Sequence, residues 1–283
     1  MMLIYLRKTP VGIICLALLF ILACKKDKPE ETPMVKKGIQ ISTDSKFGAV
    51  LTDSIGRTLY FFASDVAGTA NCTGACETTW PVYYSANAST DLNVNASEVA
   101  VITRSDGKKQ TTYKGYPLYY YMNDLAAGQT NGDGVGGIWF VAKPDYALMV
   151  ANFQLTGLNG KTYTKTYAEG TGKTIYFTDS KGRTLYAFSP DKNNKNTFTT
   201  DLTKNGIWPV YEGELKSVPS IITKDLIAVI DVTTIGKKQL TYKGWPLYYF
   251  GQDAIRGENK GVSVGAGPGF WPVLTVATTV APN

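Results

Sequence analysis

One pattern recurs four times along the chain: a tyrosine, an aromatic residue two positions later, and an aspartate three positions after that. The four aspartates are 59, 67 and 62 residues apart. The copies are Tyr60, Phe62 and Asp65; Tyr119, Tyr121 and Asp124; Tyr186, Phe188 and Asp191; and Tyr248, Phe250 and Asp253. A recurrence this regular indicates a fold made of repeated structural units.

The four units are of two kinds that alternate. Residues 53–60 and 179–186 agree at seven of eight positions, and residues 107–121 and 236–250 agree at twelve of fifteen. The first and third units also share a Trp-Pro-Val-Tyr segment, which begins at Trp80 and at Trp208. The chain is therefore a duplicated pair of related units, A-B-A-B.

Each unit has the composition of short β-strands. Aromatic and β-branched segments alternate with Gly, Asn and Asp, and the mature chain shows no sustained helical periodicity. In the motif, the two aromatic residues share one strand face, and we expect the Asp to accept backbone N–H groups of the following turn. The sequence predicts an all-β fold of four quasi-repeats of short antiparallel strands. They form either a propeller-like ring, which is slightly favoured, or two packed β half-domains.

The N-terminus resembles a bacterial lipoprotein signal. Two basic residues precede an apolar run at 11–20, which is too short for a typical spanning helix, and Ala23 and Cys24 follow it. The resemblance implies a signal peptide over residues 1–23 and a Cys24 that carries acyl chains such as palmitate. The alternative is an uncleaved anchor helix.

The rest of the chain divides by composition and repeat. Residues 24–46 are charged and contain proline, which predicts a flexible tether. Its start resembles the export tags of Bacteroidetes surface lipoproteins, which would place the protein in the cell envelope, at the outer membrane; a generic solvated linker explains it equally well. Residues 47–143 form the first A-B pair, 144–171 a structured connection with a hairpin signal at 158–160, and 172–283 the second pair.

Composition excludes several classes of function. The chain has no histidine, which removes His general bases, His-dependent nucleophilic sites and His-ligated zinc or haem. Basic residues are scattered, so we expect no nucleic-acid partner. Residues 129–137 and 191–196 resemble calcium loops but lack the terminal Glu, so we interpret them as turns and expect neither metal nor cofactor.

Cys72 and Cys76 are the only cysteines after Cys24. In an oxidising envelope compartment such a pair predicts a disulfide, and zinc would need two further ligands. A redox dithiol is more often spaced C-x-x-C, but the pair occurs in only one half of a duplicated chain, which keeps a redox role as an alternative.

The repeated elements, including Gly-Arg-Thr-Leu-Tyr and Trp-Pro, resemble a bacterial secreted or lipoprotein repeat family of unknown function. The resemblance covers about residues 48–274. The first unit of that family typically carries two cysteines before Trp-Pro, and Cys72 and Cys76 match this pattern. The second half holds Thr200 and Lys204 instead. The resemblance implies no particular activity.

The motif itself allows two interpretations. Tyrosine faces and carboxylates suit sugars or cationic ligands, but the same residues suit a buried core with an Asp that closes each turn. Tyr116 and Trp245 in the loops also suit a glycan or protein partner, or simply cover the sheet. We expect a non-enzymatic, membrane-anchored binding or scaffold module for an envelope protein or glycan. The alternative is a redox or electron-transfer accessory.

Overall fold

The computed structural model describes residues 1–4 and 35–283, and residues 35–283 form one compact unit. Most of the predicted signal peptide, the predicted lipidation site Cys24 and the start of the predicted tether lie outside the described residues. Within the described ranges, no helix combines the length and apolar character that a bilayer crossing requires.

The first half is built around a five-stranded antiparallel sheet. A separate hairpin precedes it, formed by β1 (Gln40–Asp44) and β2 (Gly48–Thr52). The sheet has the order β4-β5-β6-β3-β7. Its strands are β3 (Tyr60–Phe62), β4 (Val99–Thr103), β5 (Lys109–Tyr113), β6 (Tyr116–Tyr119) and β7 (Trp139–Val141).

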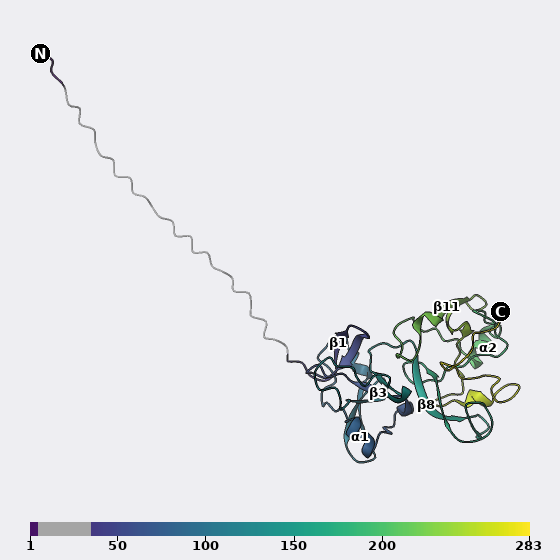
Figure 1. Ribbon diagram of the computed structural model, residues 1–283. Helices are drawn as coiled ribbons and strands as arrows, with labels where there is room; N and C mark the ends of the chain where they lie inside the picture. Colours follow the sequence, from purple (N-terminus) through teal and green to yellow (C-terminus); the bar gives the residue numbers. More distant parts are fainter. Residues whose placement is uncertain (5–34) are drawn as a thin grey trace. The chain divides into compact units, whose positions relative to one another are not determined.

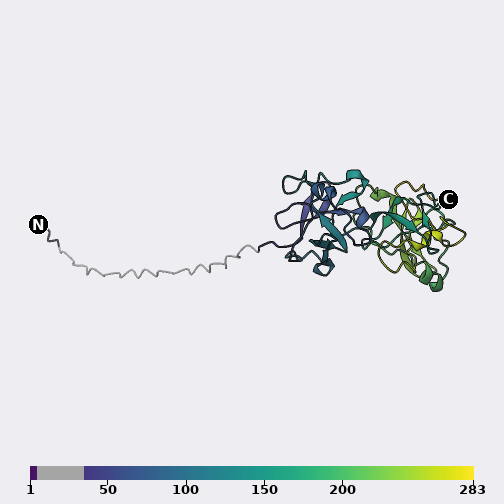
Figure 2. The same cartoon turned by 90° about the horizontal axis from the view of Figure 1, so that it is seen from below.

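The second half repeats this arrangement. The strands β8 (Met149–Thr156), β9 (Thr162–Tyr163) and β10 (Lys173–Thr178) form one sheet; β11 (Ile227–Val232), β12 (Lys237–Tyr242) and β13 (Trp245–Pro246) form another. Single bridges join Tyr186 to Tyr248 and to Val273, just as Tyr60 pairs with Tyr119 and Val141. Figure 1 and Figure 2 show the halves as two lobes, coloured purple to teal and teal to yellow.

The all-β prediction and the two packed half-domains are confirmed, and the slightly favoured propeller-like ring is wrong. In the five-stranded sheet of the first half, β3 of the A unit is inserted between β6 and β7 of the B unit. An A unit and a B unit therefore share one sheet and cannot be separate blades.

Each half begins earlier than its sequence repeat indicated. Strand β1 lies inside the predicted 24–46 tether, and Ile39 beside it is fully buried, so the tether prediction is wrong for this part. Strand β8 lies inside the predicted 144–171 connection and pairs with β10 as β1 pairs with β2. The hairpin predicted at 158–160 is present between β8 and β9. Strands β1 and β8 pair through backbone groups and do not resemble each other in sequence. The sequence repeat therefore could not indicate that they are equivalent.

Short helices that the sequence did not indicate complete the fold. Two single-turn helices, α1 (Ala75–Thr79) and α2 (Leu202–Ile207), precede the two Trp-Pro segments, and they are too short to show a helical period. The remaining turns are η1 (Ala63–Asp65), η2 (Ala96–Glu98), η3 (Val135–Gly137), η4 (Lys224–Leu226) and η5 (Lys260–Ser263).

The core is unusually rich in tyrosine. Eight of the twelve largest fully buried side chains are tyrosines. A buried phenol needs a hydrogen-bond partner for its hydroxyl, so the core must also contain acceptors. The motif aspartates supply four of them.

Candidate functional site

The motif residues of the first half exchange hydrogen bonds between its two units. The Tyr60 hydroxyl donates to Asp124 Oδ2 at 2.5 Å, and the Tyr119 hydroxyl donates to Asp65 Oδ2 at 2.7 Å. Each unit therefore supplies the donor for the other unit's carboxylate. All four residues are buried.

The second half contains the same exchange. Tyr186 donates to Asp253 Oδ2 at 2.6 Å, and Tyr248 donates to Asp191 Oδ2 at 2.7 Å. Tyr60 faces Tyr119 across the sheet, and Tyr186 likewise faces Tyr248. The four copies of the motif thus form two reciprocal pairs.

The second oxygen of each aspartate fixes the loop that follows it. In the first half, Asp65 Oδ1 accepts the Asn71 N–H at 2.8 Å, and Asp124 Oδ1 accepts the Asn131 N–H at 2.9 Å. The equivalent donors in the second half are the N–H groups of Thr197 and Lys260. This is the turn-closing role that the sequence predicted.

Sequence reasoning missed the Tyr–Asp exchange, although the four copies contain a signal for it. The first aromatic position is tyrosine every time, whereas the second is Phe62, Tyr121, Phe188 or Phe250. A hydroxyl group is therefore needed only at the first position.

Burial sets the protonation of these pairs. Desolvation raises the pKa of Asp65 to about 6 and that of Asp253 to about 6, although their hydrogen-bond donors act in the opposite direction. Desolvation and the adjacent carboxylate also raise the pKa of Tyr119 and of Tyr186. At neutral pH the Asp65 and Asp253 carboxyls are therefore mostly ionised, and the Tyr119 and Tyr186 phenols stay neutral.

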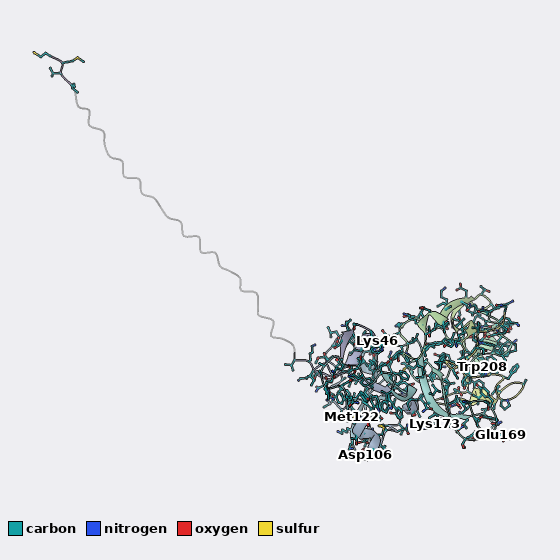
Figure 3. All side chains as sticks on the ribbon, viewed as in Figure 1. Lys46, Asp106, Met122, Glu169, Lys173 and Trp208 are labelled. Atoms are coloured by element: carbon teal, nitrogen blue, oxygen red, sulfur yellow. A yellow bond between two sulfur atoms is a disulfide. The ribbon has the colours of Figure 1, made fainter. Side chains whose placement is uncertain are left out.

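The second aromatic residue of each motif copy closes a stack of four rings. In the first half, Phe62, Trp139, Trp80 and Tyr121 follow one another at centroid distances of 4.1, 3.9 and 4.5 Å. In the second half the stack is Phe188, Trp271, Trp208 and Phe250, at 4.5, 3.6 and 4.5 Å. Figure 3 labels Trp208 within this half. The tryptophans are buried, so the stacks belong to the core and present no aromatic platform to solvent.

A second polar cluster recurs at the surface of each half. The Arg183 guanidinium lies 3.7 Å from the ring centroid of Tyr249, whose hydroxyl donates to Asp179 Oδ2 at 2.8 Å. Arg183 and Tyr249, together with Tyr211 and Glu212, border a cleft of about 410 Å³. The first half has the same arrangement in Arg57, Tyr120 and Asp53.

The predicted disulfide is confirmed. Cys72 and Cys76 are bonded, with Cα atoms 5.3 Å apart. Cys72 is fully buried, and its carbonyl oxygen accepts a hydrogen bond from Arg104 Nη2 at 2.6 Å. Arg104 also pairs with Glu77 of helix α1. The disulfide therefore ties α1 to the loop before it, and Arg104, which follows β4, holds both in place.

The prediction that Tyr116 is exposed in a loop is wrong. Its side chain is 2% exposed and packs against Phe61 at a centroid distance of 5.5 Å. Trp245, its equivalent, is only half-buried, and its indole N–H donates to the Thr279 carbonyl. Among the residues that the structure describes, no cluster of three His, Cys, Asp or Glu side chains could hold a metal ion.

Three segments of the chain match a family model described as a secreted repeat of unknown function. They are residues 42–83, 100–143 and 229–275, which contain the first, second and fourth copies of the motif. No curated protein and no solved structure matches the chain. Secretion implies a location outside the cytoplasm, which suits a chain that holds a disulfide.

Proposed function

Three of the four units are secreted repeats of the family of unknown function, and from this we propose that the protein is a lipid-anchored envelope protein that acts as a non-enzymatic binding or scaffold module. The order of apolar run, Ala23 and Cys24 supports the anchor. An extracytoplasmic location supports an envelope partner, either a protein or a glycan.

One observation carries the binding role. Every motif tyrosine is buried, as are three of the four motif aspartates, and Asp253 is partly buried; all eight are hydrogen-bonded to another part of the same half. The recurring polar residues are therefore used to build the core, and they offer no convergent acid and base to a substrate. Recognition then depends on surface features such as the Arg183 cleft.

Labelling with a palmitate analogue tests the anchor. We expect the intact chain to incorporate label and to sediment with membranes, and Cys24→Ala to lose both properties. The double variant Cys72→Ala/Cys76→Ala is the matched control and should keep the label. An unlabelled intact chain, or a labelled Cys24→Ala variant, would contradict the anchor.

Glycan and envelope-protein binding by residues 35–283 tests the module. We expect a reproducible ligand whose retention is lost in Arg183→Gln but kept in Lys173→Gln, which changes an exposed lysine that does not line the cleft. If repeated experiments find no retained ligand, the result contradicts the binding role.

The redox alternative depends on a cysteine pair present in one half only. It has less support, because Cys72 is fully buried and its carbonyl oxygen accepts a hydrogen bond from Arg104. Mass spectrometry with and without reductant, together with a visible spectrum, tests it. A colourless protein whose disulfide resists a physiological thiol would eliminate this alternative.

A further inference from the structure

A groove of about 360 Å³ lies where four separate segments of the chain meet. The turn between β1 and β2 contributes Phe47, residues 144–145 and 216–217 form further walls, and Lys224 stands at the start of η4. A parallel bridge between Tyr146 and Ser217 holds two of these walls together. The groove is thus assembled from the hairpin of the first half, the connection at 144–145 and two segments of the second half.

Three lysines lie at or beside the groove without an ion-pair partner among the described residues: Lys224 lines it, whereas Lys46 and Lys143 stand next to Phe47. The Lys46 ammonium lies 4.7 Å from the Phe47 ring centroid, and the Lys143 ammonium lies 5.7 Å from the same centroid. In the part of the chain that the structure describes, no carboxylate lies within 4.0 Å of Lys46, Lys143 or Lys224. Figure 3 labels Lys46 on the first half.

The carboxylates near these lysines are already engaged. Asp145 lies in the groove, 3.8 Å from Lys114 Nζ and 3.7 Å from Lys216 Nζ. Asp44 Oδ1 accepts the N–H groups of Lys46 and Phe47 and thereby fixes the turn. Asp133 Oδ1 accepts the N–H of Val141. Even with Asp145 counted, the groove keeps an excess of positive charge.

Lys143 is the most constrained of the three lysines. It is half-buried between two aromatic rings, with Tyr146 at 5.8 Å on the side away from Phe47. Desolvation lowers the pKa of Lys143, while Asp133 and Asp44 oppose that change and Lys224 adds to it. A partly desolvated cation without a counterion is costly, and a bound anion removes that cost.

The groove has no counterpart in the second half. Val141 and Val273 make equivalent pairings in the two halves. Two residues after them stand Lys143 and Thr275, so Thr275 is the equivalent of Lys143. The residue equivalent to Phe47, which precedes β2, is Lys173 at the start of β10. Lys173 pairs with Gln154. The groove is therefore not explained by the repeat.

We propose that this groove is a binding site for a phosphate group, held by Lys143 and Lys224 with Lys46 at its rim and with the Phe47 ring against the apolar part of the ligand. Lysine binds phosphate as a point charge, and aromatic contact adds affinity for an attached sugar or acyl moiety. A phosphorylated solute and a phospholipid headgroup both have this chemistry. The inference rests on the binding role proposed above and is independent of the lipid anchor.

Titration of ¹⁵N-labelled residues 35–283 at low ionic strength tests the site. One arm uses inorganic phosphate, and the other uses phosphatidylcholine vesicles with or without phosphatidylglycerol. We expect the backbone signals of Phe47, Asp145 and Ser217 to change. A change with phosphate alone assigns a soluble ligand, and a change only with phosphatidylglycerol vesicles assigns a headgroup.

Charge-matched variants separate the site from general basicity. Lys143→Met/Lys224→Gln keeps the aliphatic packing of Lys143, and we expect it to weaken binding by about tenfold. Lys165→Gln/Lys173→Gln removes two charges elsewhere, and we expect it to change binding by less than about twofold. Equal losses in both variants, or unchanged signals in both arms, would overturn the site. Because the titration uses residues 35–283, its result does not depend on lipidation of Cys24. A failure of the phosphate site can therefore be told apart from a failure of the lipid anchor.

Discussion

At the scale of single residues, the hydroxyl group explains why the first motif position is tyrosine in every copy. Removing it from Tyr119 leaves the buried Asp65 carboxylate with its backbone donor but without its strongest side-chain partner. A buried acceptor that loses one partner costs about 1–3 kcal/mol.

We therefore expect Tyr119→Phe, and its equivalent Tyr248→Phe, each to lower the free energy of unfolding by about 1–3 kcal/mol. Urea denaturation measures the change. Tyr84→Phe is the matched control, because Tyr84 is 46% exposed and should be neutral. If the two buried variants unfold like Tyr84→Phe, the reciprocal exchange contributes nothing to stability.

The protonation of Asp65 makes a prediction about pH. Its folded pKa of about 6 exceeds the ordinary value of 3.8, so the folded state binds the proton more tightly than the unfolded state. This contribution to stability is fully present below about pH 4 and is lost as pH rises through about 6. It amounts to at most about 3 kcal/mol.

We expect the free energy of unfolding of Asp65→Asn to vary less between pH 4 and 7 than that of the unmodified chain. The difference between the two curves isolates this one group from all other carboxyls. Superimposable pH profiles would show that Asp65 titrates normally.

At the scale of structural elements, the ring stacks depend on two glycines. A Cβ on Gly132 would lie 2.9 Å from atoms of Tyr60, Trp80 and Tyr121. A Cβ on Gly261 would lie 2.7 Å from Trp208 and 2.9 Å from Tyr186. The loop after each B-unit aspartate therefore lies directly on the aromatic core.

Alanine at Gly132 or at Gly261 should destabilise the protein by about 1–3 kcal/mol, because rings on both sides would have to move. Gly206→Ala in α2 is the matched control: nothing lies within 4 Å of its Cβ position, and alanine favours a helix. Thermal melting should show a lower midpoint for the first two variants and no loss for the third. Equal midpoints would mean that the loops lie farther from the rings.

The sequence predicted these elements unevenly, and the physical reasons differ. The β composition, the turn role of the aspartates and the Cys72–Cys76 bond all depend on residues close in sequence, and they were predictable. The Tyr–Asp exchange joins residues 54 to 67 positions apart, and β1 and β8 pair through backbone groups that leave no residue pattern. The exposed Arg183 cleft and the lysine groove depend on packing between such elements.

At the scale of the whole molecule, one arginine joins the halves. Arg256 Nε donates to the Val66 carbonyl at 2.5 Å and Nη1 donates to the Lys114 carbonyl at 2.9 Å. Its guanidinium also lies 4.4 Å from the Tyr116 ring centroid. Gly115 makes room for it, since a Cβ there would lie 1.6 Å from Nη1.

The second half has an equivalent surface, but a different part of the chain packs against it. Lys243 is the equivalent of Lys114, and its carbonyl accepts the Ala281 N–H at 2.9 Å. Lys243 Nζ donates to the carbonyls of Val276 and Thr278. Residues 276–282 thus occupy on the second half the place that Arg256 occupies on the first.

We expect Arg256→Ala to separate the unfolding of the two halves. It removes two charge-assisted hydrogen bonds and a cation–π contact, together worth about 2–4 kcal/mol at the junction, while the Tyr–Asp pairs within each half stay intact. The indole ¹H–¹⁵N NMR signals of Trp80 and Trp208, followed during denaturation, would report the first and second half separately, and in Arg256→Ala their transitions should no longer coincide. Arg256→Lys should not restore coincidence, because one ammonium cannot reach both carbonyls and cover the ring. Coincident, unshifted transitions in Arg256→Ala would mean that the other contacts between the halves, such as the Lys181–Glu98 ion pair, suffice to couple them.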